Sequence, residues 1–135
     1  MLKLREIPVY QPTVAVIVLI LYLTLLPQPF GEEDIPLFPG ADKIAHFMMF
    51  GGLTGTYIYD RWRWDKPVGL KGALVAALCS ATFGAIVEWL QAAMEMGRTG
   101  NDIYDAMANT AGAFTAVAVC KALHWINVTV ERHSR

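Results

Sequence analysis

The sequence predicts an all-α protein, an integral membrane bundle of four transmembrane helices with both termini in the cytoplasm. Of its 135 residues, 55% are hydrophobic and only 17% are charged. The mean hydropathy is +0.38, and the apolar residues form long blocks without the alternation that is typical of a strand. The Lys and Arg residues are concentrated in segments that would share one side of such a bundle. A chain of this length fits a single domain, residues 1–135.

The first expected span, residues 13–30, begins after Pro12 and ends in "LLPQPF". Proline is tolerated at helix ends and disrupts a helix interior, so these positions favour a helix bounded by them. Lys3 and Arg5 precede the apolar run, as in a signal peptide, but no small-residue cleavage site follows. We therefore expect this helix to be retained.

The other three spans are expected at residues 43–59, 70–94 and 103–128. The second ends before "DRWRWDKP", whose indoles and cations are typical of a segment anchored at lipid headgroups. All three carry small residues at helical spacing, which allow helix backbones to approach closely in lipid. They predict a compact bundle and also offer contacts for a homo-oligomer. These residues are Gly51 and Gly55; Gly72, Ala76, Ser80 and Gly84, beside Ala73, Ala77, Ala81 and Ala85; and Ala108, Gly112 and Ala116.

The placement of Lys and Arg predicts the orientation, because these residues are enriched on the cytoplasmic side of membrane proteins. With a cytoplasmic N-terminus, only Lys43 and Arg98 lie outside. The other nine of the eleven fall inside, and they are Lys3, Arg5, Arg61, Arg63, Lys66, Lys71, Lys121, Arg132 and Arg135. We therefore expect four spans with both termini in the cytoplasm.

This topology brings most of the unusual polar residues to the outer ends of three spans. On the fourth span, Asp102, Asp105, Asn109 and Gly112 share one helix face, and on the third Glu88 and Gln91 do the same. Both faces should therefore look into the bundle. The predicted site consists of Asp42, Lys43, His46, Glu88, Gln91, Arg98, Asp102, Asp105 and Asn109.

Helix capping and packing are the alternative explanation for this set. Asn101 or Asp102 would cap the fourth span, and Asp105 would lie favourably near its positive end. Arg98 would pair with a neighbouring carboxylate, and His46 would be a hydrogen-bonded packing residue. Capping does not explain Glu88 and Asn109, which should lie one and a half to two turns inside the hydrocarbon edge. An ionisable group there costs about 2–3 kcal/mol, so a site is the favoured interpretation.

The same residues resemble a known family. "ADKIAHF", "EWLQ", "GRTGND" and "DAMANTAG" occur in this order, and with "LYLTLLP" in the first span they resemble the VanZ-like membrane proteins from about Leu23 to Ala118. The resemblance implies a small multi-pass protein of the bacterial cytoplasmic (inner) membrane. The family takes its name from a member associated with low-level resistance to the glycopeptide teicoplanin, which does not define a mechanism.

Two classes of function fit these residues. In the first, the site binds or modulates a lipid-linked envelope precursor, a polar headgroup or a glycopeptide at the membrane surface, with Lys43 and Arg98 contacting phosphate or carboxylate. In the second, the protein is a hydrolase or transferase acting on a lipid-linked substrate. His46 with Glu88 or Asp105 would then be the catalytic acid–base pair.

The sequence disfavours several other classes of function. The net charge of −1 and the lack of a long basic run argue against a nucleic-acid partner. Cys79 and Cys120 lie inside apolar blocks, where a disulfide or a cysteine metal site is not expected. No cofactor is predicted. A divalent ion held by acidic residues and His46 is a variant of the enzyme hypothesis, which the two nearby cations, Lys43 and Arg98, disfavour as a site built only for metal.

Overall fold

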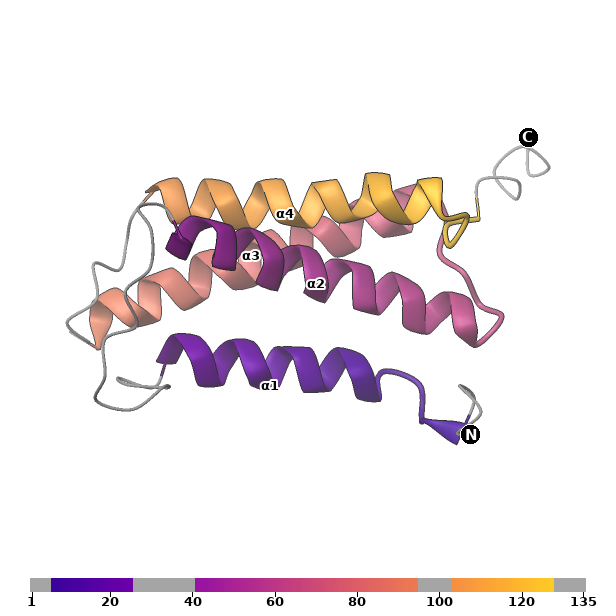
Figure 1. Ribbon diagram of the computed structural model, residues 1–135, viewed down its shortest axis with the longest axis horizontal. Helices are drawn as coiled ribbons and strands as arrows, with labels where there is room; N and C mark the ends of the chain where they lie inside the picture. The colour runs from indigo at the N-terminus through magenta and orange to yellow at the C-terminus, as the bar shows by residue number, and fades with distance from the viewer. Residues whose placement is uncertain (1–5, 26–40, 95–102, 128–135) are drawn as a thin grey trace.

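The computed structural model describes residues 6–25, 41–94 and 103–127, and these residues form four α-helices and no strand (Figure 1). The all-α prediction is therefore confirmed. The helices are α1 (Gln11–Leu25), α2 (Ala41–Arg63), α3 (Leu70–Ala93) and α4 (Ile103–Ala122).

Two helix ends within the described residues differ from the predicted spans by more than two residues. α2 continues one turn beyond residue 59, and this added turn contains an ion pair three residues apart, with Arg63 Nη2 3.1 Å from Asp60 Oδ1. α4 stops at Ala122, ahead of the predicted end at 128. His124 follows with a φ of 60°, a left-handed conformation that cannot continue an α-helix.

The helices run in alternating directions, so α1 begins and α4 ends at the same end of the bundle, to the right in Figure 1. The closest packing is between α2 and α4. A Cβ atom built on Gly112 would lie 2.1 Å from the carbonyl oxygen of Phe47, and one on Gly51 would lie 2.9 Å from the carbonyl oxygen of Gly112. The two backbones are therefore in direct contact, as small residues permit between helices in lipid.

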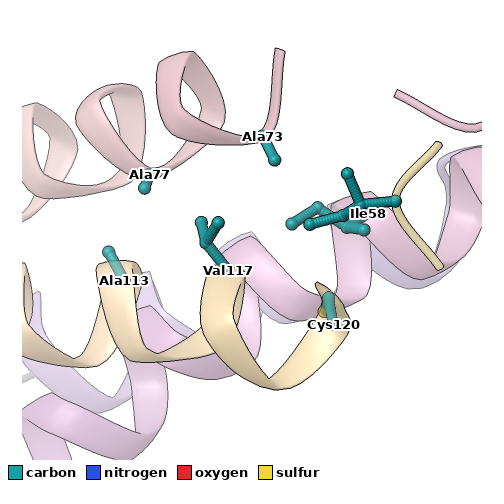
Figure 2. Packing of buried hydrophobic residues seen from close by; sticks show 7 residues of the cluster. Ile58, Ala73, Ala77, Ala113, Val117 and Cys120 are labelled. Carbon is teal, nitrogen blue, oxygen red and sulfur yellow. The ribbon is translucent and has the colours of Figure 1, made fainter. Parts of the chain in front are cut away.

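A cluster of small and medium apolar side chains joins α2, α3 and α4 (Figure 2). Ala73 and Ala77 of α3 face this cluster, whereas Gly72 and Ala85 are exposed. The predicted packing stripe of the third span was therefore partly wrong, because the buried face is rotated from it. The cluster consists of Ile58, Ala73, Ala77, Ala113, Val117, Cys120 and Ile126.

Buried polar groups attach α1 to the end of α2. Asp60 is fully buried, and its Oδ2 accepts hydrogen bonds from the backbone N–H and the hydroxyl of Thr13 in the first turn of α1. Arg63 pairs with Asp60 and donates to the carbonyl oxygens of Ile7 and Pro8 at 2.9 and 3.1 Å. The interpretation of the indoles and cations of residues 60–67 as a headgroup anchor is therefore wrong for Arg63, whose charge is paired with Asp60 inside the bundle.

Among the described residues, one helix is long and apolar enough to cross a membrane by length and composition, namely α3. Its 24 residues extend over about 36 Å at the usual helical rise, against a hydrocarbon core of about 30 Å. α1 is also apolar but has only 15 residues. α2 and α4 are interrupted by the polar side chains that form the site described next.

Candidate functional site

Five polar residues from three helices meet at one end of the bundle, and we call them the polar cluster: Lys43, His46, Glu88, Asp105 and Asn109. This is the left-hand end in Figure 1, where α2 and α4 begin and α3 ends. Lys43 and His46 lie in the first two turns of α2, Glu88 lies near the end of α3, and Asp105 and Asn109 lie in the first two turns of α4. The alternation of helix direction therefore brings together residues that are far apart in the sequence.

His46 lies at the centre of the polar cluster. Its Nδ1 is 2.9 Å from Asn109 Oδ1 and 3.4 Å from Glu88 Oε1, and its Nε2 is 3.9 Å from Asp105 Oδ2. Two acceptor oxygens approach Nδ1, so this nitrogen carries the hydrogen and donates it to the Asn109 amide oxygen. In the neutral ring, the lone pair is then on Nε2, the nitrogen that faces Asp105.

The acidic and amide side chains of the cluster are almost completely inside the protein. Glu88 and Asp105 are 5% and 6% exposed, and Asn109 is 1% exposed. Asn109 packs against Gly84 of α3, where a Cβ atom would lie 2.8 Å from Asn109 Nδ2. A glycine at this position therefore makes room for the amide. Within the described part of the chain, Asn109 Nδ2 has no hydrogen-bond partner.

Lys43 connects the cluster to its surroundings. Its Nζ is 3.2 Å from Asp105 Oδ1, and its side chain is 37% exposed, compared with 8% for that of Asp105. The pair is therefore half solvated, and its Coulombic energy is reduced by screening. The other oxygen of Asp105, Oδ2, faces His46.

The remaining predicted site residues are placed differently. Gln91 is buried and donates from Nε2 to the carbonyl oxygen of Thr24 at 2.8 Å, so in this structure it binds the end of α1. Arg98 and Asp102 lie outside the described residues, and so does the side chain of Asp42. Five of the nine predicted residues thus meet in one cluster in the structure.

The cluster offers two kinds of chemistry. An imidazole beside two buried carboxylates is an arrangement that can transfer protons to or from a bound molecule. One ligand atom from each of His46, Glu88 and Asp105 can also be chosen so that all lie within 4.8 Å of one another, a spacing that could hold a metal ion. The three side chains come from α2, α3 and α4, so the packing of the bundle fixes their relative positions.

An apolar groove of about 390 Å³ lies between α1, α2 and α3, and the sequence did not predict it. Ile17, Leu53, Ala76 and Phe83 are among its lining residues. Two aromatic contacts connect it to the polar cluster. The His46 ring stacks on Phe50 at 6.5 Å between centroids, and Phe50 contacts Phe83 at 5.9 Å. Gly72 and Ala76 of the third span, which were expected to contact another helix, line this groove. Ser80 also lines it but contacts α2 as expected, because its hydroxyl accepts a hydrogen bond from Thr54 at 2.9 Å.

Comparison with protein families matches residues 12–125 of the chain to the family described as VanZ/LLP1. The match covers all four helices except Gln11, the first residue of α1. No curated protein and no solved structure gives a match.

Proposed function

Because the chain belongs to the VanZ/LLP1 family, we propose that it is a multi-pass protein of the bacterial cytoplasmic membrane that binds an amphiphilic envelope ligand. Family membership and the apolar helix α3 indicate a membrane protein. In the proposal all four helices span the bilayer, both termini are cytoplasmic, and the polar cluster faces outward. The ligand is a lipid-linked envelope precursor or a similar amphiphile, and tolerance of the glycopeptide teicoplanin would be one consequence of binding it.

The outer surface of the bundle supports the placement in lipid. Large apolar side chains are exposed on every helix, among them Val18 on α1, Met48 on α2, Leu78 on α3 and Met107 on α4. Exposed apolar side chains distributed around a whole bundle are costly in water and are suited to hydrocarbon.

The convergence of the polar cluster is the observation that carries the proposed binding function. His46, Glu88 and Asp105 are buried within a bundle whose exterior is apolar. Ionisable residues inside a membrane are costly, and those that are present generally bind a substrate, an ion or a proton. Lys43, the most exposed member, would contact the charged headgroup, and the Asn109 amide would orient it by a hydrogen bond.

The apolar groove supports an amphiphilic ligand rather than a purely polar one. Its volume of about 390 Å³ is within the range of small-molecule sites, which are mostly lined by apolar side chains. The groove lies on the far side of Phe50 from His46, between α1 and α3. A ligand with its headgroup at the cluster could extend an acyl or polyprenyl chain along the bundle toward this groove.

An enzymatic function is the second candidate, and the position of His46 favours it. The ring lies between two buried carboxylates, with Glu88 Oε1 3.4 Å from Nδ1 and Asp105 Oδ2 3.9 Å from Nε2. Such a group could act as acid or base in hydrolysis or transfer on a lipid-linked substrate. No Ser or Cys belongs to the polar cluster, so the attacking group would be water, a hydroxyl of the substrate or His46 itself.

The proposed function is tested by identifying lipids that copurify with the full chain. The protein is extracted in a mild detergent, and bound lipids are measured by mass spectrometry for the wild type, Glu88→Gln and a matched control, Glu6→Gln, whose residue is exposed at the other end of the bundle. We expect one class of envelope amphiphile to be enriched with the wild type and the control and depleted with Glu88→Gln. Bulk membrane lipid in equal proportions on all three proteins would refute specific binding, and conversion of the enriched lipid on incubation would establish the enzymatic alternative.

A further inference from the structure

We propose that His46, Glu88 and Asp105 bind a divalent metal cation, with His46 Nε2 and one oxygen of each carboxylate as ligands. All three residues are buried and are supplied by different helices. One ring nitrogen of His46 and one oxygen of each carboxylate lie within 4.8 Å of one another. The contact of Glu88 with the ring is at Nδ1, at 3.4 Å, so the Glu88 carboxylate would turn toward Nε2 to bind the ion. Two ligands at about 2.0–2.2 Å from one cation are at most about 4.4 Å apart, so the three side chains would move a few tenths of an ångström closer when they bind it.

The distance between His46 and Asp105 is the first observation that supports a cation. Nε2 and Oδ2 are 3.9 Å apart, which is too long for a hydrogen bond. Two ligands of one cation, each about 2.0–2.2 Å from it, are separated by up to about twice that length. The gap between the two atoms therefore fits an ion between them better than it fits a direct contact.

The role of Asn109 is the second observation. A histidine that binds a metal through one nitrogen usually donates the hydrogen of its other nitrogen to a carboxylate or carbonyl oxygen, which fixes the tautomer. His46 Nδ1 lies 2.9 Å from Asn109 Oδ1, leaving the Nε2 lone pair toward Asp105. Asn109 is thus a positioning residue for the proposed ligand.

The amide nitrogen of Asn109 independently indicates that a water molecule or a ligand binds in the polar cluster. Asn109 is 1% exposed, and Nδ2 is without a hydrogen-bond partner in the described part of the chain. It faces Gly84, one helical turn from Glu88 on the same buried face of α3. A buried N–H group in this position is available to an oxygen atom of a water molecule or a ligand bound beside the cation.

The charges of the cluster also favour a cation. The cluster contains two carboxylates, Glu88 and Asp105, and a lysine, Lys43, whose Nζ is 3.2 Å from Asp105 Oδ1 and whose side chain is 37% exposed. Both carboxylates are available as anionic ligands of a divalent ion inside the bundle. The same ion would also bridge the two carboxylates to an anionic headgroup, which they would otherwise repel. This second role rests on the proposed function.

The donor set limits which metal fits. One imidazole nitrogen and two carboxylate oxygens are ligands that suit Mn²⁺ or Zn²⁺, while an all-oxygen set would be expected for Ca²⁺ or Mg²⁺. We therefore take Mn²⁺ as the probe, because its binding can be followed by electron paramagnetic resonance, and Zn²⁺ as the competitor.

The experiment titrates the full chain in detergent with Mn²⁺ alone, without added lipid. The variants are Glu88→Gln and Asp105→Asn, and their matched controls are Glu6→Gln and Asp65→Asn, two exposed residues outside the cluster. Asp65 has a φ of 57°, which Asn tolerates well. Circular dichroism and thermal unfolding verify that every variant is folded. Saturable binding is expected for the wild type and both controls, with competition by Zn²⁺ and a rise in the midpoint of thermal unfolding.

The variants separate ligands from positioning residues. Glu88→Gln and Asp105→Asn should each weaken Mn²⁺ binding by more than about a hundredfold, and Asn109→Ala by about ten- to a hundredfold, as is usual for a residue that orients a ligand. Absence of saturable binding to the wild type, or equal binding to the wild type and to folded Glu88→Gln and Asp105→Asn, would overturn the proposal.

This result is independent of the lipid measurement. Metal binding without enrichment of an amphiphile would support the cation site and refute the proposed ligand. Enrichment of an amphiphile on a protein that binds no Mn²⁺ would refute the cation site and leave the proposed ligand supported.

Discussion

At the scale of single residues, two glycines determine how closely the helices of the polar cluster approach one another. Gly112 lets α4 contact the backbone of α2 at Phe47, and Gly84 makes room for Asn109 between α3 and α4. The cluster therefore depends on residues that have no functional groups of their own. A side chain at either position would separate the helices that carry His46, Glu88 and Asp105.

Gly112→Ala is expected to destabilise the protein, because its Cβ would lie 2.1 Å from the carbonyl oxygen of Phe47. Backbone atoms cannot move aside as a flexible side chain can. The loss in free energy of unfolding should therefore be at or above the upper end of about 1–3 kcal/mol. Thermal unfolding in detergent measures this loss. The control is Gly52→Ala, since a Cβ there meets nothing within 4 Å, and helix propensity should make it neutral or stabilising by up to about 1 kcal/mol. Equal unfolding midpoints for the two variants would contradict the packing of α2 against α4.

Glu88→Gln is expected to be folded, at least as stable as the wild type, and inactive. The substitution keeps the size and hydrogen-bonding groups of the side chain and removes a buried charge, which lowers the cost of burial in the membrane. Activity is measured as complementation in an envelope assay that detects loss of the gene, with thermal unfolding alongside. Asp105→Asn should behave similarly with a stability loss of up to about 1 kcal/mol, because it removes a negative charge near a helix N-terminus. Normal activity in both variants would assign the cluster a packing role only.

At the scale of helices, α1 packs less extensively against the other helices than any of them does. Polar contacts at both of its ends compensate for this limited packing. Asp60 and Arg63 hold its beginning, and Gln91 holds its end at Thr24. The groove begins at the first attachment, where Thr13 lines it, and includes Ile17 one turn further along α1. We infer that the polar contacts allow α1 to stay in place without closing the groove.

Asp60→Ala tests this attachment. The substitution leaves Arg63, which is 6% exposed, without its carboxylate and removes the acceptor of the Thr13 N–H. Loss of one partner of a buried ion pair typically costs about 3–5 kcal/mol. Hydrogen exchange should therefore accelerate first in α1, while the amides of α4 retain their protection. Asp65→Asn, an exposed position nearby, serves as the control, and uniform acceleration over all four helices would argue against a separate attachment of α1.

The sequence predicted the number and order of the helices because long apolar blocks and proline boundaries are local signals. It also predicted that Asp105, Asn109 and Gly112 share a buried face, which the structure confirms, since helical spacing alone determines this. It did not predict the rotation of α3 or the groove, because both depend on which of two adjacent small-residue stripes packs against α4. The burial of Asp60 and Arg63 was missed for a similar reason, because their partners lie near the start of the chain.

At the scale of the whole molecule, the arrangement of the helices and the distribution of charge lead to the same orientation. α1 begins and α4 ends at one end of the bundle, and the polar cluster is at the other (Figure 1). Among the described Lys and Arg residues, Lys43 lies at the end with the polar cluster, and the others lie at the first end: Arg61, Arg63, Lys66, Lys71 and Lys121. Under the positive-inside rule, this distribution supports the proposed orientation, in which the polar cluster faces outward.

This orientation predicts the behaviour of a reporter fused after Arg135. A reporter that is active only in the cytoplasm should be active there, and one that requires export should be inactive. A second fusion within residues 95–102, between α3 and α4, should show the opposite pattern, which controls for expression. The charge bias also predicts the effect of changing Arg61, Lys66 and Lys71 together to Gln. The preference for cytoplasmic termini should become weaker, because Lys and Arg in short loops near the ends of the spans determine the orientation in the membrane. An export-dependent reporter that is active after Arg135 would invert the proposed topology, and the polar cluster would then face the cytoplasm.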